Sequence, residues 1–235
     1  MATVHLWQAG LDCDRSQLVP YAQILSPDER QRADRFVKPL HRDRFIAGRG
    51  ILRVLLGQCL GIAPERLQFS YGPHGKPELA YPAEAGWQFN LAHSEDQSLI
   101  ALTQGAAIGV DLEKIRPMPQ LDQLTARFYA PAEHAQIMAT PLADRETLFF
   151  RYWTCKEAFL KATGEGLGKL QQLELALGRS VQAGIVRIVT LPESPPTAWQ
   201  LRELPLTNDF VGAIAVAHAE IVISFDSFQT GEFLC

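Results

Sequence analysis

The sequence is short of cysteine and of positive charge, and each shortage excludes a class of protein. Its four cysteines lie far apart and form no Cys-x-x-Cys pair, so we expect neither a disulfide framework nor a zinc site, and a reducing cytosol fits best. The 22 Lys and Arg residues are outnumbered by 26 Asp and Glu residues, which leaves no overall basic field to hold a nucleic-acid backbone. Nucleic acid is therefore not an expected partner.

Long apolar runs and the commonest catalytic signatures are also missing. No run of about 18 apolar residues occurs. The first residues lack the basic and then apolar pattern of a secretory signal, so we expect a cytoplasmic protein without a membrane partner. There is no GxSxG, HExxH, Walker A or GxGxxG pattern, which removes the signatures of serine hydrolases, zincins, P-loop proteins and Rossmann domains.

The composition that remains is that of a globular protein. Of the 235 residues, 47% are hydrophobic and 20% are charged, which is enough apolar material for a proper core. The length fits either one large domain or two of about equal size.

The order of predicted elements favours two similar halves. Residues 1–25 predict a short strand and a turn, Ser26-Pro27-Asp28-Glu29 is typical of a helix start, and a second helix after Pro39 ends at Gly61. Strands are predicted at 67–71, 87–91, 98–103 and 106–113. Helices are then predicted at 121–128, from Pro131 and at 145–163, followed by a glycine-rich loop at 164–168 and strands near 173–177, 184–190, 198–204 and 211–218. We interpret this order as a weak internal duplication with its seam near 105–120.

The segment from Ala107 to Glu113 alternates in a way that pairs two carboxylates. On a strand, Ile108, Val110 and Leu112 share the apolar face, and Asp111 and Glu113 share the other. Neighbouring carboxylates repel each other and gain from sharing a cation, and oxygen-only ligands suit Mg²⁺. Taken alone, such alternation more often marks a solvated outer face.

The predicted helix at 145–163 carries a second set of charged residues. Its core stripe is Leu148, Tyr152, Cys155, Phe159 and Ala162. Trp153, Glu157 and Lys161 follow each other at intervals of four along a neighbouring edge. A surface ion pair between Glu157 and Lys161 is the simplest interpretation. The glycine-rich loop after the helix, which allows a ligand close to the backbone, favours a site instead.

Two loops present further polar residues. The turn at 72–77 displays His74 and Lys76, as a phosphate clamp or as a plain exposed turn. The segment Phe89-Asn90-Leu91-Ala92-His93-Ser94 displays His93 and Ser94 at a strand end, although a single histidine is more often structural.

Taken together, these motifs resemble a known family. In order along the chain, the motifs are Arg44 with Gly-Arg-Gly-Ile-Leu-Arg, then Gly-Lys-Pro, Asn-x-x-His-Ser, Gly-Val-Asp-Leu-Glu and Trp-Thr-Cys-Lys-Glu-Ala-x-x-Lys-Ala-x-Gly-x-Gly-Leu. Together they are similar to the 4′-phosphopantetheinyl transferase family, in its longer, Sfp-like branch. The resemblance runs from about Ser26 to Leu167.

The resemblance implies an α/β (α+β) fold of two similar subdomains related by a pseudo-twofold axis, with the active site in the cleft between them. Residues 1–110 would form the half that binds the phosphates of coenzyme A, and residues 111–235 the half with metal and catalytic elements. The implied reaction moves the phosphopantetheine arm of coenzyme A to a serine of an apo acyl, peptidyl or polyketide carrier protein and releases adenosine 3′,5′-bisphosphate.

Residue roles follow from the same resemblance. Asp111, Glu113 and Glu157 match the ligands of Mg²⁺, with Mn²⁺ as the alternative, and Glu157 also matches the base. Lys161 would stabilise the pyrophosphate or protonate the leaving group. The positions that match coenzyme A contacts are Arg44, Lys76, His93, Lys156 and Lys161, with a weaker match at Arg32. Glu133 resembles a further acid of the family.

Two other functions compete with the transferase. One is a non-catalytic protein that binds coenzyme A or a nucleotide through the same cations, and the other is a structural module in which the carboxylates and Lys161 are solvated surface. Because one chain carries both sets of residues, we expect a monomer.

Overall fold

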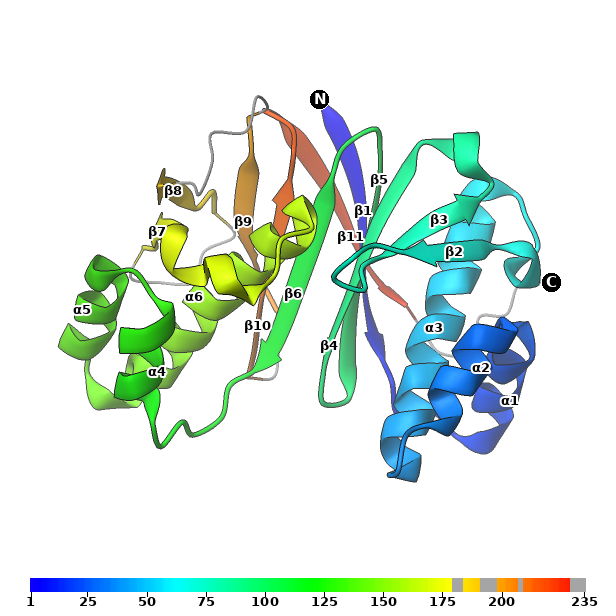
Figure 1. The fold of residues 1–235 in the computed structure, drawn as a ribbon, viewed down its shortest axis with the longest axis horizontal. Coiled ribbons are helices and arrows are strands. Elements are labelled where there is room, and N and C mark those ends of the chain that lie inside the picture. Colours follow the sequence, from blue (N-terminus) through cyan, green and yellow to red (C-terminus); the bar gives the residue numbers. More distant parts are fainter. Residues whose placement is uncertain (179–183, 191–197, 207–208, 229–235) are drawn as a thin grey trace.

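The computed structural model describes residues 1–178, 184–190, 198–206 and 209–228, and Figure 1 shows two groups of helices on opposite sides of a central layer of strands. The helices are α1 (Arg15–Ile24), α2 (Pro27–Asp34), α3 (Pro39–Leu60), α4 (Leu121–Phe128), α5 (Pro131–Ala139) and α6 (Leu142–Thr163), with short 3-10 helices η1 (Pro64–Arg66), η2 (Ala83–Ala85) and η3 (Leu167–Gln172). The strands are β1 (Ala2–Gly10), β2 (Gln68–Tyr71), β3 (Pro77–Tyr81), β4 (Trp87–Ser94), β5 (Gln97–Gln104), β6 (Ile108–Lys114), β7 (Glu174–Ala176), β8 (Arg187–Thr190), β9 (Gln200–Leu204), β10 (Phe210–Val216) and β11 (Ile221–Phe228).

The two halves repeat one order of elements. Each has a strand (β1, β6), two short helices (α1 and α2, α4 and α5), a long helix (α3, α6), a 3-10 helix (η1, η3), a two-stranded ribbon (β2–β3, β7–β8) and two further strands (β4 and β5, β9 and β10). The sheet orders β1-β5-β4 and β6-β10-β9 also match, with antiparallel pairing throughout. The predicted α/β fold of two similar subdomains is confirmed.

The seam between the halves lies just before β6. The predicted boundary between residues 110 and 111 falls inside β6, so we propose instead that the boundary lies between the end of β5 and Ile108. The last strand, β11, crosses back and pairs with β1 in parallel, which adds a fourth strand to the first sheet.

The long helices form the core as their periodicity predicts. The stripe on α6 is fully buried, and its members are Leu148, Tyr152, Cys155, Phe159 and Ala162. On α3 the buried side chains include Ile51, Leu52, Leu55 and Leu56. Both helices are 22 residues long and end at a glycine in the left-handed region, Gly61 (φ 64°) and Gly164 (φ 77°), which is a common helix stop. Within the described ranges, none of the helices combines the length and apolarity that crossing a bilayer requires.

Two elements of the first half were not predicted, helix α1 and strand β3. The residues after β1 form helix α1 rather than a turn, although Pro20 lies inside that helix. The Gly/Pro-rich turn at 72–77 leads directly into strand β3, which pairs with β2.

Candidate active site

The backbone of β6 touches helix α6 at Gly109. A Cβ atom at that position would lie 2.1 Å from the carbonyl oxygen of Ala158 and 2.4 Å from the backbone nitrogen of Ala162. Only glycine permits this approach, because any side chain would push the helix away. The contact brings the carboxylates of β6 next to the charged edge of α6.

Lys161 forms its ion pair across this contact. Its Nζ lies 2.6 Å from Oδ1 of Asp111, whose residue is only 5% exposed. The simpler expectations, a solvated Asp111 and a surface pair between Glu157 and Lys161, therefore do not describe this site.

Two carboxylate oxygens of the site are buried without a hydrogen-bond partner among the described residues, Asp111 Oδ2 and Glu157 Oε1. Burial raises the pKa of Asp111 to about 6, against the lowering effect of Lys161, and the Glu113 charge raises it further. Burial and then the Asp111 charge raise the pKa of Glu157 to about 7. Burial lowers the pKa of Lys161, but Asp111 and Glu157 outweigh it and the net shift is upward. The site thus holds an excess of negative charge that one lysine balances only in part.

Glu113 is held by polar groups of the neighbouring strand and loop. Ser94 Oγ donates to Glu113 Oε2 (2.8 Å), and so does Nη1 of Arg116 (2.9 Å). The backbone N–H of Lys114 donates to the same Ser94 Oγ (3.2 Å). Ser94 therefore links the end of β4 to the end of β6.

Asn90 makes a similar link that the sequence analysis missed. Its Oδ1 accepts a hydrogen bond from the backbone N–H of Val110 at 2.9 Å, and the residue is buried. Side chains of β4 thus satisfy the backbone of β6 where the two sheets meet. The signal in the sequence was an amide side chain that stands between two apolar residues, Phe89 and Leu91, of a predicted strand.

The donor set fits a hard divalent cation. Asp111, Glu113 and Glu157 offer only oxygen ligands, and two of their oxygens lack a partner in the described part of the chain, which suits Mg²⁺. The described residues contain no group of three His, Cys, Asp or Glu side chains already arranged around a metal position. In this structure Asp111 is instead paired with Lys161, and Glu113 with Ser94 and Arg116.

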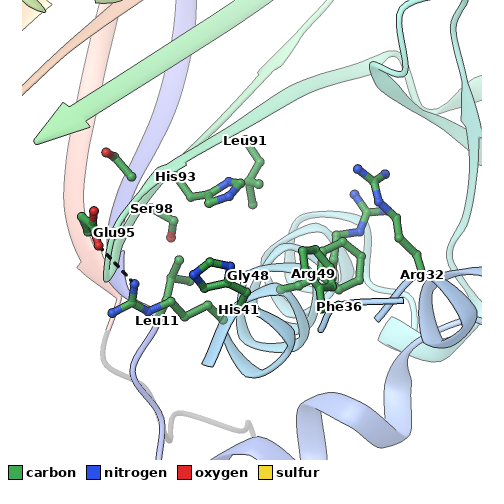
Figure 2. A pocket seen from close by; sticks show the side chains of 13 residues that line it. Leu11, Arg32, Phe36, His41, Gly48, Arg49, Leu91, His93, Glu95 and Ser98 are labelled. Atoms are coloured by element: carbon green, nitrogen blue, oxygen red, sulfur yellow. Dashed lines mark ion pairs between the residues drawn. The ribbon is translucent and has the colours of Figure 1, made fainter. Parts of the chain in front are cut away.

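A cavity of about 460 Å³ adjoins this cluster at Ser94. It is lined by Leu11, Arg32, Phe36, His41, Arg44, Phe45, Gly48, Arg49, Leu91, His93, Ser94, Glu95 and Ser98. Figure 2 shows Leu91 and His93 on the strand side, facing Arg32, His41 and Arg49 on the helical side. The cavity collects several cations in one place, which is the chemistry of an anion site.

Arg44 enters this cavity already paired with acids. Its Nε and Nη2 donate to Asp12 at 2.7 and 3.1 Å, and its Nη1 lies 3.6 Å from Glu95. Arg32 and Arg49 line the same cavity, but Arg49 is itself paired with Glu29 at 2.6 Å, so Arg32 is the lining arginine that adds charge.

His93 connects the cavity with the carboxylates. Burial lowers its pKa, and the charge of Lys161 lowers it further, against the effect of Glu113. A neutral imidazole at this point can donate or accept a hydrogen bond.

Lys76 lies at the junction of the two halves, away from the cavity lining that the structure describes. Its Nζ donates to the carbonyl oxygens of Ile108 (3.1 Å) and Ala162 (3.3 Å), and burial lowers its pKa. His74 of the same turn lies beside Gly166, where a Cβ atom would be 3.5 Å from its ring. The turn thus rests against the end of α6.

Lys156 does not fit its expected contact with coenzyme A. The side chain is fully buried, and its Nζ binds Glu133 Oε2 at 2.7 Å and the carbonyl oxygens of Leu170 and Leu173. We therefore remove it from the set of binding residues.

Comparison with known proteins covers nearly the whole chain. A family model described as "4′-phosphopantetheinyl transferase superfamily" matches residues 107–215, and one described as "4′-phosphopantetheinyl transferase, N-terminal" matches residues 11–105. The 4′-phosphopantetheinyl transferase HetI of Nostoc sp. is 46% identical over 215 residues, which is 91% of this chain and 87% of the relative.

Two less similar relatives carry the same family name. A protein of Synechocystis sp. is 39% identical over 198 residues (83% of this chain, 78% of the relative). The 4′-phosphopantetheinyl transferase Sfp of Bacillus subtilis is 24% identical over 201 residues, 85% of each chain. The two family models meet at residues 105–107, where the structural repeat also begins anew.

Proposed function

The chain belongs to the 4′-phosphopantetheinyl transferase family, and from this premise we propose how its residues divide the work of the reaction. The enzyme transfers the 4′-phosphopantetheine arm of coenzyme A to a carrier protein. The serine Oγ of the carrier forms a bond to the β-phosphorus of coenzyme A, the bond from that phosphorus to the bridging oxygen breaks, and adenosine 3′,5′-bisphosphate leaves.

The cationic cavity is our proposed site for the phosphates on the adenosine side of coenzyme A. Arg44 and His93 were expected there, and both line it together with Arg32. A second hollow of about 600 Å³ lies beside the first and shares Arg32 and Phe36 with it as lining residues. Lys76 would contribute from the junction, where partial burial strengthens its effect on a nearby anion.

Asp111, Glu113 and Glu157 would hold Mg²⁺, with Mn²⁺ as the alternative. The ion, when bound, neutralises charge on the pyrophosphate as the leaving group departs. For this chain the requirement is that all three carboxylates be ionised, since a protonated carboxyl is a poor ligand.

Glu157 is our proposed general base for the serine hydroxyl. A base works best when its pKa lies near the working pH. In the metal-free protein, burial together with the Asp111 charge raises the pKa of Glu157 to about 7, and a bound divalent cation would lower it from there. Its unpartnered Oε1 is free to accept a proton.

Lys161 would stabilise the pyrophosphate or protonate the leaving group. Its ammonium group is kept charged by the surrounding carboxylates. It reaches the site from the same edge of α6 as Glu157, one helical turn further on.

One observation carries the proposal against a protein that only binds coenzyme A. Asp111 Oδ2 and Glu157 Oε1 are buried and unpartnered beside a cationic cavity. Binding an anion gains nothing from buried carboxylates, whereas a metal-dependent transferase requires them.

The test is incubation with coenzyme A, Mg²⁺ and several apo carrier proteins, followed by mass spectrometry of the carrier. We expect the mass of phosphopantetheine to be added to at least one carrier. Coenzyme A binding without a mass shift on fatty-acid, polyketide and peptide carriers would instead favour the binding protein.

We also propose that the enzyme acts in the cytosol as a monomer, because one chain supplies both the cationic cavity and the carboxylates. Light scattering coupled to gel filtration tests the second point, and a mass of two chains at assay concentration would contradict it.

A further inference from the structure

Two buried cations occupy equivalent places in the two halves. Arg53 on α3 and Lys156 on α6 each stand eight residues before the glycine that ends their helix, Gly61 and Gly164. Both residues have no exposed surface.

Their carboxylate partners are equivalent as well. Arg53 Nε lies 2.7 Å from Glu29 Oε2, and Lys156 Nζ lies 2.7 Å from Glu133 Oε2. Each glutamate is the third residue of a helix that begins at a proline, and each carboxylate also accepts the N–H of the residue before that helix, at 3.0 and 2.8 Å.

The remaining hydrogen-bond acceptors of the two cations have the same spacing in the sequence. Arg53 Nη1 donates to the carbonyl oxygens of Pro64 (2.8 Å) and Leu67 (3.0 Å). Lys156 Nζ donates to those of Leu170 (2.7 Å) and Leu173, again three residues apart and around a 3-10 helix. We call this arrangement of one cation, one glutamate and two carbonyls the cation cradle.

The second cradle adjoins the carboxylates, whereas the first adjoins the cationic cavity through Arg49, which also pairs with Glu29. Glu157 directly follows Lys156, while the α3 positions equivalent to Glu157 and Lys161 hold Val54 and Gln58. Glu133 Oε1 also accepts the N–H of Leu175 at 2.8 Å, so the second cradle ties α5, α6 and the start of β7 together.

We propose that Lys156 and Glu133 are positioning residues of the transferase, whose cradle fixes α6 so that Glu157 and Lys161 face Asp111 on β6. The proposal rests on the proposed function of that site. Its physical basis is that α6 packs directly against the backbone of β6 at Gly109, where no side chain lies between them that could adapt to a shift of the helix. A small movement of α6 would therefore change the spacing of the three carboxylates.

The test compares matched variants of the two cradles. Glu133→Gln and Lys156→Met alter the second cradle, and Arg53→Met alters the first, where Arg49 still pairs with Glu29 at 2.6 Å. For each folded variant we would measure kcat, KM for coenzyme A, the thermal midpoint, and Mn²⁺ binding by electron paramagnetic resonance in the absence of substrates.

We expect the second-cradle variants to lose about 10- to 100-fold in kcat. Mn²⁺ binding weakens alongside, while KM for coenzyme A changes less than kcat, because most of its proposed contacts lie in the cavity of the other half. Arg53→Met keeps kcat at saturating coenzyme A and keeps Mn²⁺ binding, even with a similar drop in thermal midpoint. Lys156→Arg, which copies the cation of the first cradle, restores part of the Mn²⁺ binding lost in Lys156→Met.

Two results would overturn the proposal. One is wild-type kcat and Mn²⁺ binding in folded Glu133→Gln. The other is a loss of kcat in Arg53→Met as large as in the second-cradle variants for the same drop in thermal midpoint. That result would indicate a merely structural role for both cradles. If Lys156→Met does not fold, Glu133→Gln is judged by the same criteria. A wild-type protein that transfers nothing to any carrier would contradict the proposed function itself, a separate outcome.

Discussion

The Nζ atom of Lys161 lies 2.6 Å from Oδ1 of Asp111, and this ion pair joins the last turns of α6 to the middle of β6. Its two partners come from segments 50 residues apart in the chain. The pair holds one oxygen of Asp111 and leaves the other, Oδ2, unpartnered within the described residues. One lysine thus stabilises a group of carboxylates while leaving an oxygen available for a metal ion.

Removing the lysine tests this relationship. Lys161→Met is expected to lower kcat by about 10²- to 10³-fold, because a charge aimed at the developing anion is lost. The Asp111 pKa rises, since Lys161 lowers it in the wild-type protein, so Mn²⁺ binding shifts to higher pH. Steady-state kinetics and a binding titration between pH 5.5 and 8.5 measure both effects. Lys169→Met, a half-exposed lysine that pairs with Glu165, is the control, and an equal loss there would contradict the assignment.

The raised pKa of Glu157 predicts that this carboxylate destabilises the folded, metal-free protein at high pH. Between its unfolded value of 4.5 and its folded value of about 7 the native state binds the additional proton, so stability falls as pH rises through this window. Glu157→Gln removes that loss and is expected to stabilise the metal-free protein at pH 8 by about 1–3 kcal/mol, with no gain at pH 4. Urea unfolding at the two pH values in a chelator measures this difference. A variant less stable than wild type at pH 8 would argue against a strained carboxylate.

Metal binding should offset this destabilisation. In wild type, Mg²⁺ at 100 times its dissociation constant is expected to raise the free energy of unfolding by about 2.7 kcal/mol. Asp111→Asn removes one of the proposed ligands, so its thermal midpoint is expected not to respond to Mg²⁺. Thermal melts with and without Mg²⁺ make the comparison. The same Mg²⁺-dependent rise in Asp111→Asn would place the ion elsewhere.

Gly109→Ala tests the contact between β6 and α6. The new Cβ atom would meet backbone atoms of Ala158 and Ala162 at 2.1 and 2.4 Å, and backbone cannot move aside cheaply. We expect a loss of stability of about 1–3 kcal/mol, together with a lower kcat because Glu157 and Lys161 are displaced. Gly10→Ala, where a Cβ meets nothing within 4 Å, is the matched control and is expected to change neither quantity. Normal kinetics in Gly109→Ala would show that the site tolerates a shift of α6.

The cationic cavity predicts a different kinetic signature. Arg44→Ala removes a charged donor from the proposed phosphate site, so KM for coenzyme A is expected to rise about 10- to 100-fold, with little change in kcat. Arg42→Ala, on the same helix but half-exposed and paired only loosely with Asp43 at 3.8 Å, is the control. A fall in kcat at unchanged KM would move Arg44 out of the binding role.

Much of the fold could be predicted because periodicity is a local property of the sequence. The alternation at Ile108, Val110 and Leu112 places all three in the core, and the stripe of α6 is buried throughout. The missing helix is α1, because its internal Pro20, the sixth of its ten residues, is a strong signal against a helix.

The site could be predicted less completely, since it depends on contacts between distant segments. Asp111 is exposed or buried according to whether a helix covers it, and the alternation of β6 contains no information on α6. Lys156 is a neighbour of Glu157 in sequence, yet successive helix residues differ by about 100° in direction. This rotation points the side chain of Lys156 toward Glu133 and away from the cavity. Gly109 shows its role only when α6 is in place.

The most direct test of the central claim is a single-turnover assay that follows the mass of an apo carrier protein with wild type and with Glu157→Gln, each loaded with coenzyme A and Mg²⁺. We predict that wild type adds phosphopantetheine to the carrier, and that Glu157→Gln, folded and still able to bind coenzyme A, adds none on the same time scale. Transfer by Glu157→Gln at the wild-type rate would contradict the assignment of the base and of the carboxylate site around it.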